Sequence, residues 1–467
     1  MASSVFQPAR VSPAQQISAP VSANVATKPR DRWGFLEWFV LAQVILPALL
    51  YVPGSQSFRA PLRIAPFALS LAGMVVWVYA ARRIRPHVAV MPLVCIIAYL
   101  TLMIASPTTN SLLSGAAQVG LYFSVMAPVF WAPYLVRSEG QLRRVLTILL
   151  ICNGINAMVG VLQVYEPERF LPREFSTIAE NSMGGIAHYI GPDGHEIVRP
   201  PGLSDNPGAV CGPASTAALL GLIFAMQPIG WVKRGISLLM CFAGLAAIYL
   251  SHVRTSILIV AGMYAVYVIM LLLRRESGLA LSFGFAAALL LGVALVFASV
   301  LGGESVTERF ATLFEADPTS VYYQSARGYQ LQYDTERYLY DYPMGAGLAR
   351  WGMMRVYFGN ENNDASPPLW AELQWPAWAL DGGIVLLVLY NLALILTAWS
   401  EFQACRKLGH SNLGRYATMI FAANAGVLAL VFGFTPFTNQ VGLQYWFLAG
   451  VLHGATRLVP TPQRASI

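Results

Sequence analysis

Charged residues are scarce in this chain. Asp, Glu, Lys and Arg make up 11% of its 467 residues, about half the share of an ordinary soluble domain, whereas apolar residues make up 56%. So little charge excludes a soluble globular class and indicates a protein that spans a membrane. The formal net charge of +7 is then explained by basic residues on cytoplasmic loops, and no nucleic-acid partner is expected.

Cysteine is also scarce, and its five residues form no recognisable site. Four of them lie in or beside apolar runs, and Cys405 lies in a basic loop. No CxxC pair and no metal-ligand spacing is present in the sequence, so neither a disulfide framework nor a zinc site is supported. We expect no metal and no cofactor.

Apolar runs of close to 20 residues are frequent, and this length crosses about 30 Å of hydrocarbon at about 1.5 Å per residue. They predict an all-α fold, a polytopic transmembrane helix bundle with about twelve spans. No cleavage pattern follows the first run, which is therefore expected to be a retained anchor. The runs lie at 35–52, 62–81, 90–106, 115–136, 144–164, 208–228, 235–251, 255–273, 279–301, 376–399, 414–434 and 439–456.

The segments between the runs predict five parts. The first is rich in Ser, Ala and Pro, and it has too few large apolar residues to bury a core, so we expect a disordered tail. The parts are the cytoplasmic tail 1–33, the bundle 34–301 with an outer loop at 165–207, the large periplasmic loop 302–375, the last three helices at 376–457, and the cytoplasmic tail 458–467.

Basic clusters fall in alternate loops, as the positive-inside rule requires, which predicts that both termini are cytoplasmic in a bacterial inner membrane. All three lysines fall on the cytoplasmic side, so every basic residue expected on the outer face is an arginine. Arg59 and Arg63 in the first outer loop depart from the rule, and we interpret them as snorkelling at a helix end. The clusters are Arg82-Arg83-Arg85, Arg137 with Arg143-Arg144, Lys233-Arg234, Arg274-Arg275 and Arg406-Lys407.

Arg254 is the strongest candidate binding residue on the outer face. It lies in Ser251-His-Val-Arg-Thr-Ser256, a very short connection between two apolar runs, which places it near the membrane surface. A charge at a helix centre costs at least about 2.5–3.5 kcal/mol on insertion scales, so a charge near a span requires a reason. A guanidinium offers five donors in a planar fork and suits phosphate oxygens. An interfacial anchor, or the partner of a loop acid, is the alternative.

A second candidate lies in the large loop. Residues 320–340 carry aromatic and apolar side chains at helical spacing, and Pro343 supplies a stop, so they predict a helix. Arg327 opens this helix and Asp334 lies on the same face, which suits substrate binding or an ion pair of Arg327 with Asp334 or Glu336. The tyrosines either stack on sugar rings or form an interfacial belt. They are Tyr329, Tyr333, Tyr338, Tyr340 and Tyr342.

The first long outer loop, at 165–207, leads into Arg199-Pro-Pro-Gly-Leu-Ser-Asp-Asn-Pro-Gly208, whose prolines and glycines predict a rigid, extended approach to the next helix. Arg199 is a third cation, and Asn206 lies in the same segment. His188 and His195 lie upstream and could act as bases near neutral pH, but no orienting acid accompanies them at a defined spacing.

Taken in order, these segments resemble the O-antigen ligase and polysaccharide polymerase superfamily of bacterial membrane glycosyltransferases. The similar segments are Arg199 to Pro207 for the family's Arg-Gly-Asn segment, Val253-Arg-Thr-Ser for its membrane-face arginine, Arg327 with Tyr342-Pro-Met-Gly-Ala-Gly347 for the large-loop arginine and its Pro-x-x-Gly-x-Gly, and Asp381-Gly-Gly-Ile-Val for the acidic-Gly start of the next helix. The specific similarity covers residues 195–395.

The chain departs from the family's pattern at one position. Many ligases carry a His-Asn pair shortly before the acidic-Gly segment, where this sequence has Glu372-Leu373, so the ligase histidine has no counterpart. Glu372, or another acid such as Asp364, is then the candidate general base. An ion-pair partner is the alternative for such an acid.

The resemblance implies metal-independent, inverting transfer of a glycan from undecaprenyl diphosphate on the periplasmic side. Preorganised arginines would stabilise the charge on the leaving diphosphate. It implies Arg254, Arg327 and Glu372 as catalytic residues, and Arg199, Asn206, Arg254, Arg327 and Asp334 as substrate-binding residues.

The missing His-Asn pair favours a polymerase of surface or exopolysaccharide repeat units, with a flippase and a chain-length regulator as partners. An O-antigen ligase acting on lipid A-core, a transporter of lipid-linked glycan and a non-catalytic assembly subunit are the alternatives.

Overall fold

The computed structural model describes residues 32–52, 54–80, 85–172, 188–190, 196–204, 206–311, 327–360 and 362–458. The predicted tails 1–33 and 458–467 lie almost entirely outside these ranges, as do His195, much of the outer loop 165–207 and the first part of the expected loop helix. Of His188 only the backbone is described.

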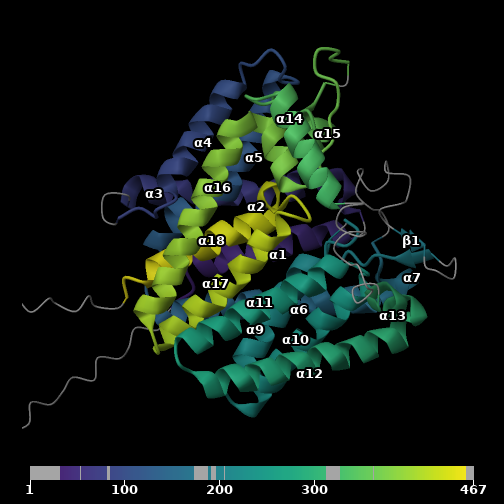
Figure 1. The fold of residues 1–467 in the computed structure, drawn as a ribbon, viewed down its shortest axis with the longest axis vertical. Helices are drawn as coiled ribbons and strands as arrows, with labels where there is room; N and C mark the ends of the chain where they lie inside the picture. The colour runs from purple at the N-terminus through teal and green to yellow at the C-terminus, as the bar shows by residue number, and fades with distance from the viewer. Residues whose placement is uncertain are drawn as a thin grey trace, which may run out of the picture. The chain divides into compact units, whose positions relative to one another are not determined.

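The described chain from Trp33 onward is a bundle of packed helices (Figure 1). Within the described residues, eight helices are long and apolar enough to cross a membrane, so the prediction of an all-α membrane bundle is confirmed. They are α2 (Arg59–Ala72) continued by α3 (Met74–Ala80), α5 (Leu112–Trp131), α6 (Glu139–Tyr165), α10 (Trp231–Leu250), α11 (Arg254–Leu273), α12 (Ser277–Gly302), α16 (Gln374–Leu408) and α17 (Asn412–Leu430).

The other four predicted spans form shorter helices, and the expected number of about twelve spans is not confirmed. Helices of 14 to 16 residues rise only about 21–24 Å, less than the hydrocarbon thickness. Pro107 follows one of them and Pro228 another, and proline ends a helix sooner than the apolar run suggests. They are α1 (Phe35–Ala48), α4 (Val90–Met103), α9 (Cys211–Ala225) and α18 (Gln440–Ala455).

The outer loop at 165–207 contains an antiparallel hairpin that the sequence analysis does not predict. Strand β1 (His188–Ile190) pairs with β2 (Glu196–Val198). Short elements complete the described chain: η1 (Leu49–Tyr51), η2 (Ser55–Phe58), η4 (Ala132–Tyr134), α7 (Pro167–Phe170), α13 (Glu304–Ala311), the π-helical segment η6 (Gln330–Asp334), α14 (Thr335–Asp341), α15 (Gly352–Phe358) and η7 (Pro436–Thr438).

Bonds between connections define two ends of the bundle. At one, which we call the loop end, the Cys211 Sγ donates to the Ser251 Oγ over 3.2 Å, which joins the start of α9 to the α10–α11 connection. At the other, the basic end, the Glu276 carboxylate pairs with Arg274 and with His410, each over 2.9 Å. The loop end corresponds to the face predicted to be periplasmic, and the basic end to the face predicted to be cytoplasmic.

The turn at Pro343–Gly347 is bound into a break in α16. The helix is interrupted at Gly382–Gly383, where Gly383 has a φ of +59°. The backbone N–H of Ala346 donates to the carbonyl of Leu380 over 2.6 Å. The two glycine-containing segments therefore form one structural unit that fixes the end of the large loop against α16.

Asp381, beside this break, is a structural residue. Its side chain is fully buried and accepts hydrogen bonds from Gln118 (3.1 Å), Tyr122 (2.6 Å) and the Trp351 indole (2.9 Å). These donors come from α5 and from the large loop. Asp381 thus joins α16 to both, as a buried carboxylate must when it is removed from water.

Candidate functional site

Arg254 is the first residue of α11, and its side chain is 8% exposed. The connection before it contains only Ser251–Val253, and His252 adopts a left-handed φ of +56° there. The Ser251 hydroxyl donates to the carbonyl of Ile248 over 2.7 Å, which ties the turn to the end of α10. Arg254 is therefore buried at a tight turn of the loop end, and both its predicted substrate contact and the alternative roles stay predictions.

Arg327 reaches the same region from the large loop. Its guanidinium Nη1 donates to the carbonyl of Gly433, just beyond α17. A Cβ atom on Gly433 would lie 3.3 Å from the Thr255 Cγ2, so the start of α11 is in contact with Gly433. The structure thus brings together the two arginine segments most strongly predicted from sequence. Within the described residues, no carboxylate forms the predicted ion pair with Arg327.

Two further arginines meet at His252. This side chain is 2% exposed, and its burial together with the positive charges of Arg309 and Arg199 lowers its pKa to about 4. Arg309 lies on α13, which is held against the end of α10 by the edge-to-face rings of Tyr249 and Phe310, 4.9 Å apart. The predicted third cation, Arg199, is therefore close to the α10–α11 connection.

His252 and Arg309 are residues that the sequence analysis missed. The signal for His252 was its place beside Arg254 in a very short connection, but the left-handed turn that buries it is invisible in sequence. Arg309 carried no signal, because its position depends on how α13 packs on α10.

The segment that carries Arg199 is fixed by α6. The Gln163 side chain binds Gly202 twice, accepting from its N–H (2.8 Å) and donating to its carbonyl (2.9 Å). The Asn156 side-chain Oδ1 accepts from the N–H of Leu203 over 3.1 Å. Asn206, by contrast, is exposed, and its described backbone bonds are to nearby Ser204 and Ala209. Its predicted substrate contact stays a prediction.

Two carboxylates lie near each other in the large loop. Partial burial and the negative charge of Glu372 raise the pKa of Asp334, and the positive charge of Arg337 opposes them. The Tyr338 hydroxyl donates to the carbonyl of Trp370 over 2.8 Å, which holds α14 against the segment before α16. Glu372 itself is exposed. The predicted base and the predicted substrate-binding acid are thus electrostatic neighbours, on the loop that carries Arg327.

An apolar groove begins at Thr255, next to Arg254, and runs along α11 and α17. These two helices lie side by side (Figure 1). Its volume is about 330 Å³, within the range of ligand pockets. It is open to the surroundings, since Leu258, Gly262 and Ala429 are exposed. It is lined by Thr255, Leu258, Ile259, Gly262, Met263, Val266, Ala425, Gly426 and Ala429.

Of the five predicted tyrosines, Tyr329, Tyr333 and Tyr340 are exposed, whereas Tyr338 and Tyr342 are half-buried. Tyr329 and Tyr333 are stacked, with ring centroids 4.9 Å apart, and are 56% and 46% exposed. The Arg63 Nη1 donates to the Tyr357 hydroxyl over 2.7 Å, which joins α2 to α15, and the snorkelling of Arg63 stays a prediction. The proposed stacking of the tyrosines on sugar rings stays a prediction.

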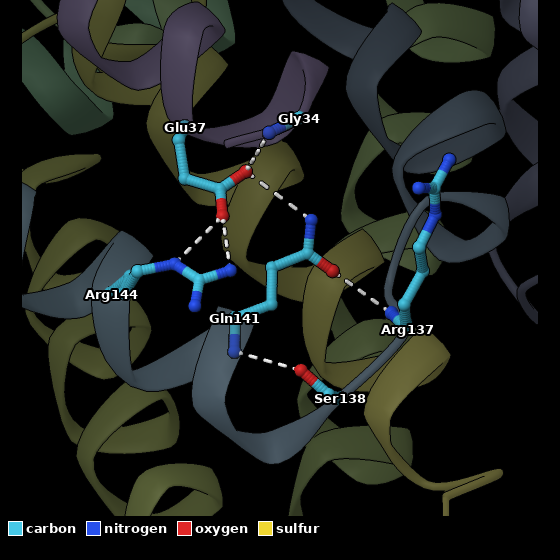
Figure 2. Close-up of polar contacts among 6 residues, drawn as sticks. All are labelled: Gly34, Glu37, Arg137, Ser138, Gln141 and Arg144. Atoms are coloured by element: carbon cyan, nitrogen blue, oxygen red, sulfur yellow. Dashed lines mark hydrogen bonds and ion pairs between the residues drawn. The ribbon is translucent and has the colours of Figure 1, made fainter. Parts of the chain in front are cut away.

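Figure 2 shows a polar cluster between the start of α1 and the start of α6. The fully buried carboxylate of Glu37 accepts from the Arg144 guanidinium (3.0 and 3.1 Å), from Gln141 (3.3 Å) and from the N–H of Gly34 (3.0 Å). Because each carboxylate oxygen is bonded, the cluster fixes the start of α1 to α6. It does not present a reactive group.

Within the described ranges, no three His, Cys, Asp or Glu side chains are grouped so as to hold a metal ion. The five cysteines are unpaired there. No protein-family model and no curated protein matches the chain.

Proposed function

We propose that this protein is a membrane glycosyltransferase that takes a glycan from a polyprenyl diphosphate, as its resemblance to the O-antigen ligase and polymerase superfamily implies. One observation carries the proposal. Arg254 opens α11, and the next residue, Thr255, begins the apolar groove on that helix. A cationic site and an apolar groove therefore adjoin.

This arrangement matches the two chemical parts of a lipid diphosphate. The groove spans Thr255 to Val266, about 17 Å at the rise of an α-helix, and it opens to the lipid. An alkyl chain placed there would bury apolar surface, and its diphosphate would lie beside Arg254 and Arg327. Guanidinium groups bind phosphate oxygens in a bidentate manner, which fixes orientation as well as charge.

The arginines would act on the leaving group. The hydroxyl oxygen of the acceptor attacks the anomeric carbon, the bond from that carbon to the diphosphate oxygen breaks, and the diphosphate leaves with the electron pair. Negative charge grows on the diphosphate during this step, so fixed cations stabilise the transition state more than the ground state. Attack opposite the leaving group inverts the anomeric centre.

The proton of the acceptor hydroxyl requires a base. Glu372 and Asp334 supply two neighbouring carboxylates on the loop that carries Arg327. A carboxylate whose pKa is raised is a stronger base in its ionised form. We assign the proton acceptor to this pair.

The acceptor is a second lipid-linked repeat unit, so the reaction lengthens a surface or exopolysaccharide. The location that we propose is the periplasmic face of the bacterial inner membrane, and the position of the arginine site at the loop end, away from the basic clusters, supports it. A ligase would instead transfer the chain to lipid A-core. Cells that lack the protein distinguish the two, since they accumulate single lipid-linked repeats if a polymerase is missing and long lipid-linked chains if a ligase is missing.

The test is elongation of undecaprenyl-diphosphate-linked repeat units by the purified protein in liposomes without an ion gradient. We expect elongation by the wild type. We expect at least a hundredfold loss for Arg254→Lys and Arg327→Lys, because the removal of an electrostatic stabiliser costs about 10²–10³ in rate and an ammonium cannot reproduce the guanidinium fork.

Arg169→Lys is the matched control, since Arg169 is an exposed arginine of the same end, paired with Glu166 over 3.6 Å. It should elongate like the wild type. A transporter would give no elongation in liposomes, and an assembly subunit would retain cellular function in both lysine variants at normal abundance. Either result overturns the proposal.

A further inference from the structure

The α10–α11 connection holds an imidazole where a diphosphate ligand would be surrounded by positive charge. His252 is buried, follows Ser251 in a turn bonded to Cys211, and precedes Arg254 by two residues. It adopts a left-handed φ of +56°, a conformation that is costly for histidine and that in proteins concentrates at functional sites.

The charged groups around His252 come from separate elements. Arg199 approaches from the segment before α9, Arg309 from α13, and Arg254 follows on α11. The neutral titratable neighbours are Tyr249 at the end of α10 and Cys211 at the start of α9. Burial of the imidazole, together with the positive charges of Arg309 and Arg199, favours its neutral form.

We propose that Arg309 and His252 are further ligands of the diphosphate, and that the diphosphate binds together with a proton taken up by His252. This inference rests on the proposed function, because it assumes that a lipid diphosphate occupies the arginine site. A bound diphosphate brings at least two negative charges close to His252 and offsets the repulsion by the arginines. The imidazolium then donates a hydrogen bond to a phosphate oxygen, as a charge-assisted ligand.

Uptake of a proton on binding makes the affinity for the diphosphate depend on pH in one direction. In the free protein the pKa of His252 is about 4, so the imidazole is uncharged above that pH. In the complex its pKa is higher, because a negative charge nearby favours the cation. Between the two values the complex holds one more proton than its separate components, so affinity increases as the pH falls, by up to about tenfold per pH unit.

The experiment is calorimetric titration of the full-length protein with phytanyl diphosphate, a saturated isoprenoid diphosphate, at pH 5 in two buffers of different ionisation enthalpy. The difference in heat gives the number of protons bound. His252→Asn is the variant, since asparagine tolerates the left-handed turn. We expect the wild type to take up close to one proton more than this variant, and both to bind with similar affinity at pH 8.

Arg309→Gln should weaken binding at least tenfold at pH 8, whereas Arg169→Gln should leave it unchanged. Equal proton uptake by the wild type and His252→Asn, or unchanged binding by Arg309→Gln, overturns this inference while the proposed function stands. Failure of the wild type to bind phytanyl diphosphate overturns the proposed function as well, so the two failures are distinguishable.

Discussion

Different contacts fix the positions of the three predicted arginines of the loop end. Arg254 is fixed by a helix start after a three-residue turn, and Arg327 by a bond to the carbonyl of Gly433. Arg199 lies in a segment that Gln163 anchors from α6. Cations held in this way need little rearrangement when charge develops on a substrate, which is the condition for electrostatic catalysis.

The raised pKa of Asp334 leads to a prediction for the pH dependence of the elongation rate. Its carboxyl must be ionised to accept a proton, so the elongation rate should fall as the pH drops through its raised pKa. Glu372→Gln removes a like charge, lowers this pKa and should move the acid limb of the pH–rate profile to lower pH. Arg337→Gln removes an opposite charge and should move it to higher pH.

The measurement is the initial rate of elongation against pH for both variants, with Glu168→Gln as a control that should leave the limb in place. Glu372 is itself a candidate base, so its variant can also lower the maximal rate. The position of the acid limb is the informative quantity. Shifts of both variants in the same direction would exclude Asp334 as the group that titrates.

Substitutions in the Glu37 cluster should change the stability of the fold and should not act directly on the glycosyl-transfer step. Arg144→Met leaves the buried Glu37 carboxylate without its cation and should destabilise the fold by about 3 kcal/mol, measured by thermal unfolding in detergent. The double variant Glu37→Leu with Arg144→Met should recover most of that loss, because no unpaired charge stays buried. A double variant less stable than Arg144→Met would contradict this account.

The sequence predicted part of this site. Arg254 could be found because a permanent charge between two apolar runs is conspicuous, and Arg327 and Arg199 because they lie in outer-loop segments whose helical spacing or prolines predict order. His252 and Arg309 could not, because burial by a left-handed turn and the docking of α13 depend on tertiary packing. The Glu37 cluster could not be predicted for the same reason, since the partners of Glu37 lie about a hundred residues away in the sequence.

At the scale of elements, the junction between the large loop and α16 is the most constrained feature. A Cβ atom on Gly383 would lie 2.1 Å from the carbonyl oxygen of Pro343, and Gly383 has a positive φ. Gly383→Ala should therefore lower the free energy of unfolding by about 3 kcal/mol, the sum of backbone strain and overpacking.

Gly409→Ala is the matched control, because Gly409 also has a positive φ but has open space at its Cβ. Its loss should be limited to the strain, about 1 kcal/mol. Thermal unfolding of the two variants checks the difference. Equal losses would mean that the Pro343–Gly347 turn is not packed into the break in α16.

Helix positions were predictable from apolar runs, whereas helix ends were not. The run at 376–399 gave the course of α16, which in the structure extends from Gln374 to Leu408. The break at Gly382–Gly383 was visible only as a sequence resemblance, since two glycines in an apolar run do not by themselves interrupt a membrane helix. The hairpin of β1 and β2 carried no signal, being only three residues per strand.

At the scale of the whole molecule, one series of contacts joins the elements of the loop end. Connections from α9, α10, α13, α17 and the large loop meet around the start of α11, and the apolar groove continues from there. Each connection contributes one or two residues, so no single segment contains the site. This distribution is why each sequence motif is weak by itself and why their order along the chain is informative.

The most direct test of the central claim is photo-crosslinking with a polyprenyl diphosphate that carries a diazirine in its alkyl chain. The protein is irradiated in liposomes, and the crosslinked peptides are mapped by mass spectrometry. The variants compared are Gly262→Trp, which fills the groove, and Gly284→Trp, placed on α12 at a glycine whose Cβ also meets open space.

We expect crosslinks on the groove residues of α11 and α17 in the wild type and in Gly284→Trp, their loss in Gly262→Trp, and competition by excess unlabelled lipid diphosphate. Crosslinks spread over the bundle surface, or groove crosslinks that persist in Gly262→Trp, would contradict the claim that one lipid diphosphate is held by the arginines and this groove together.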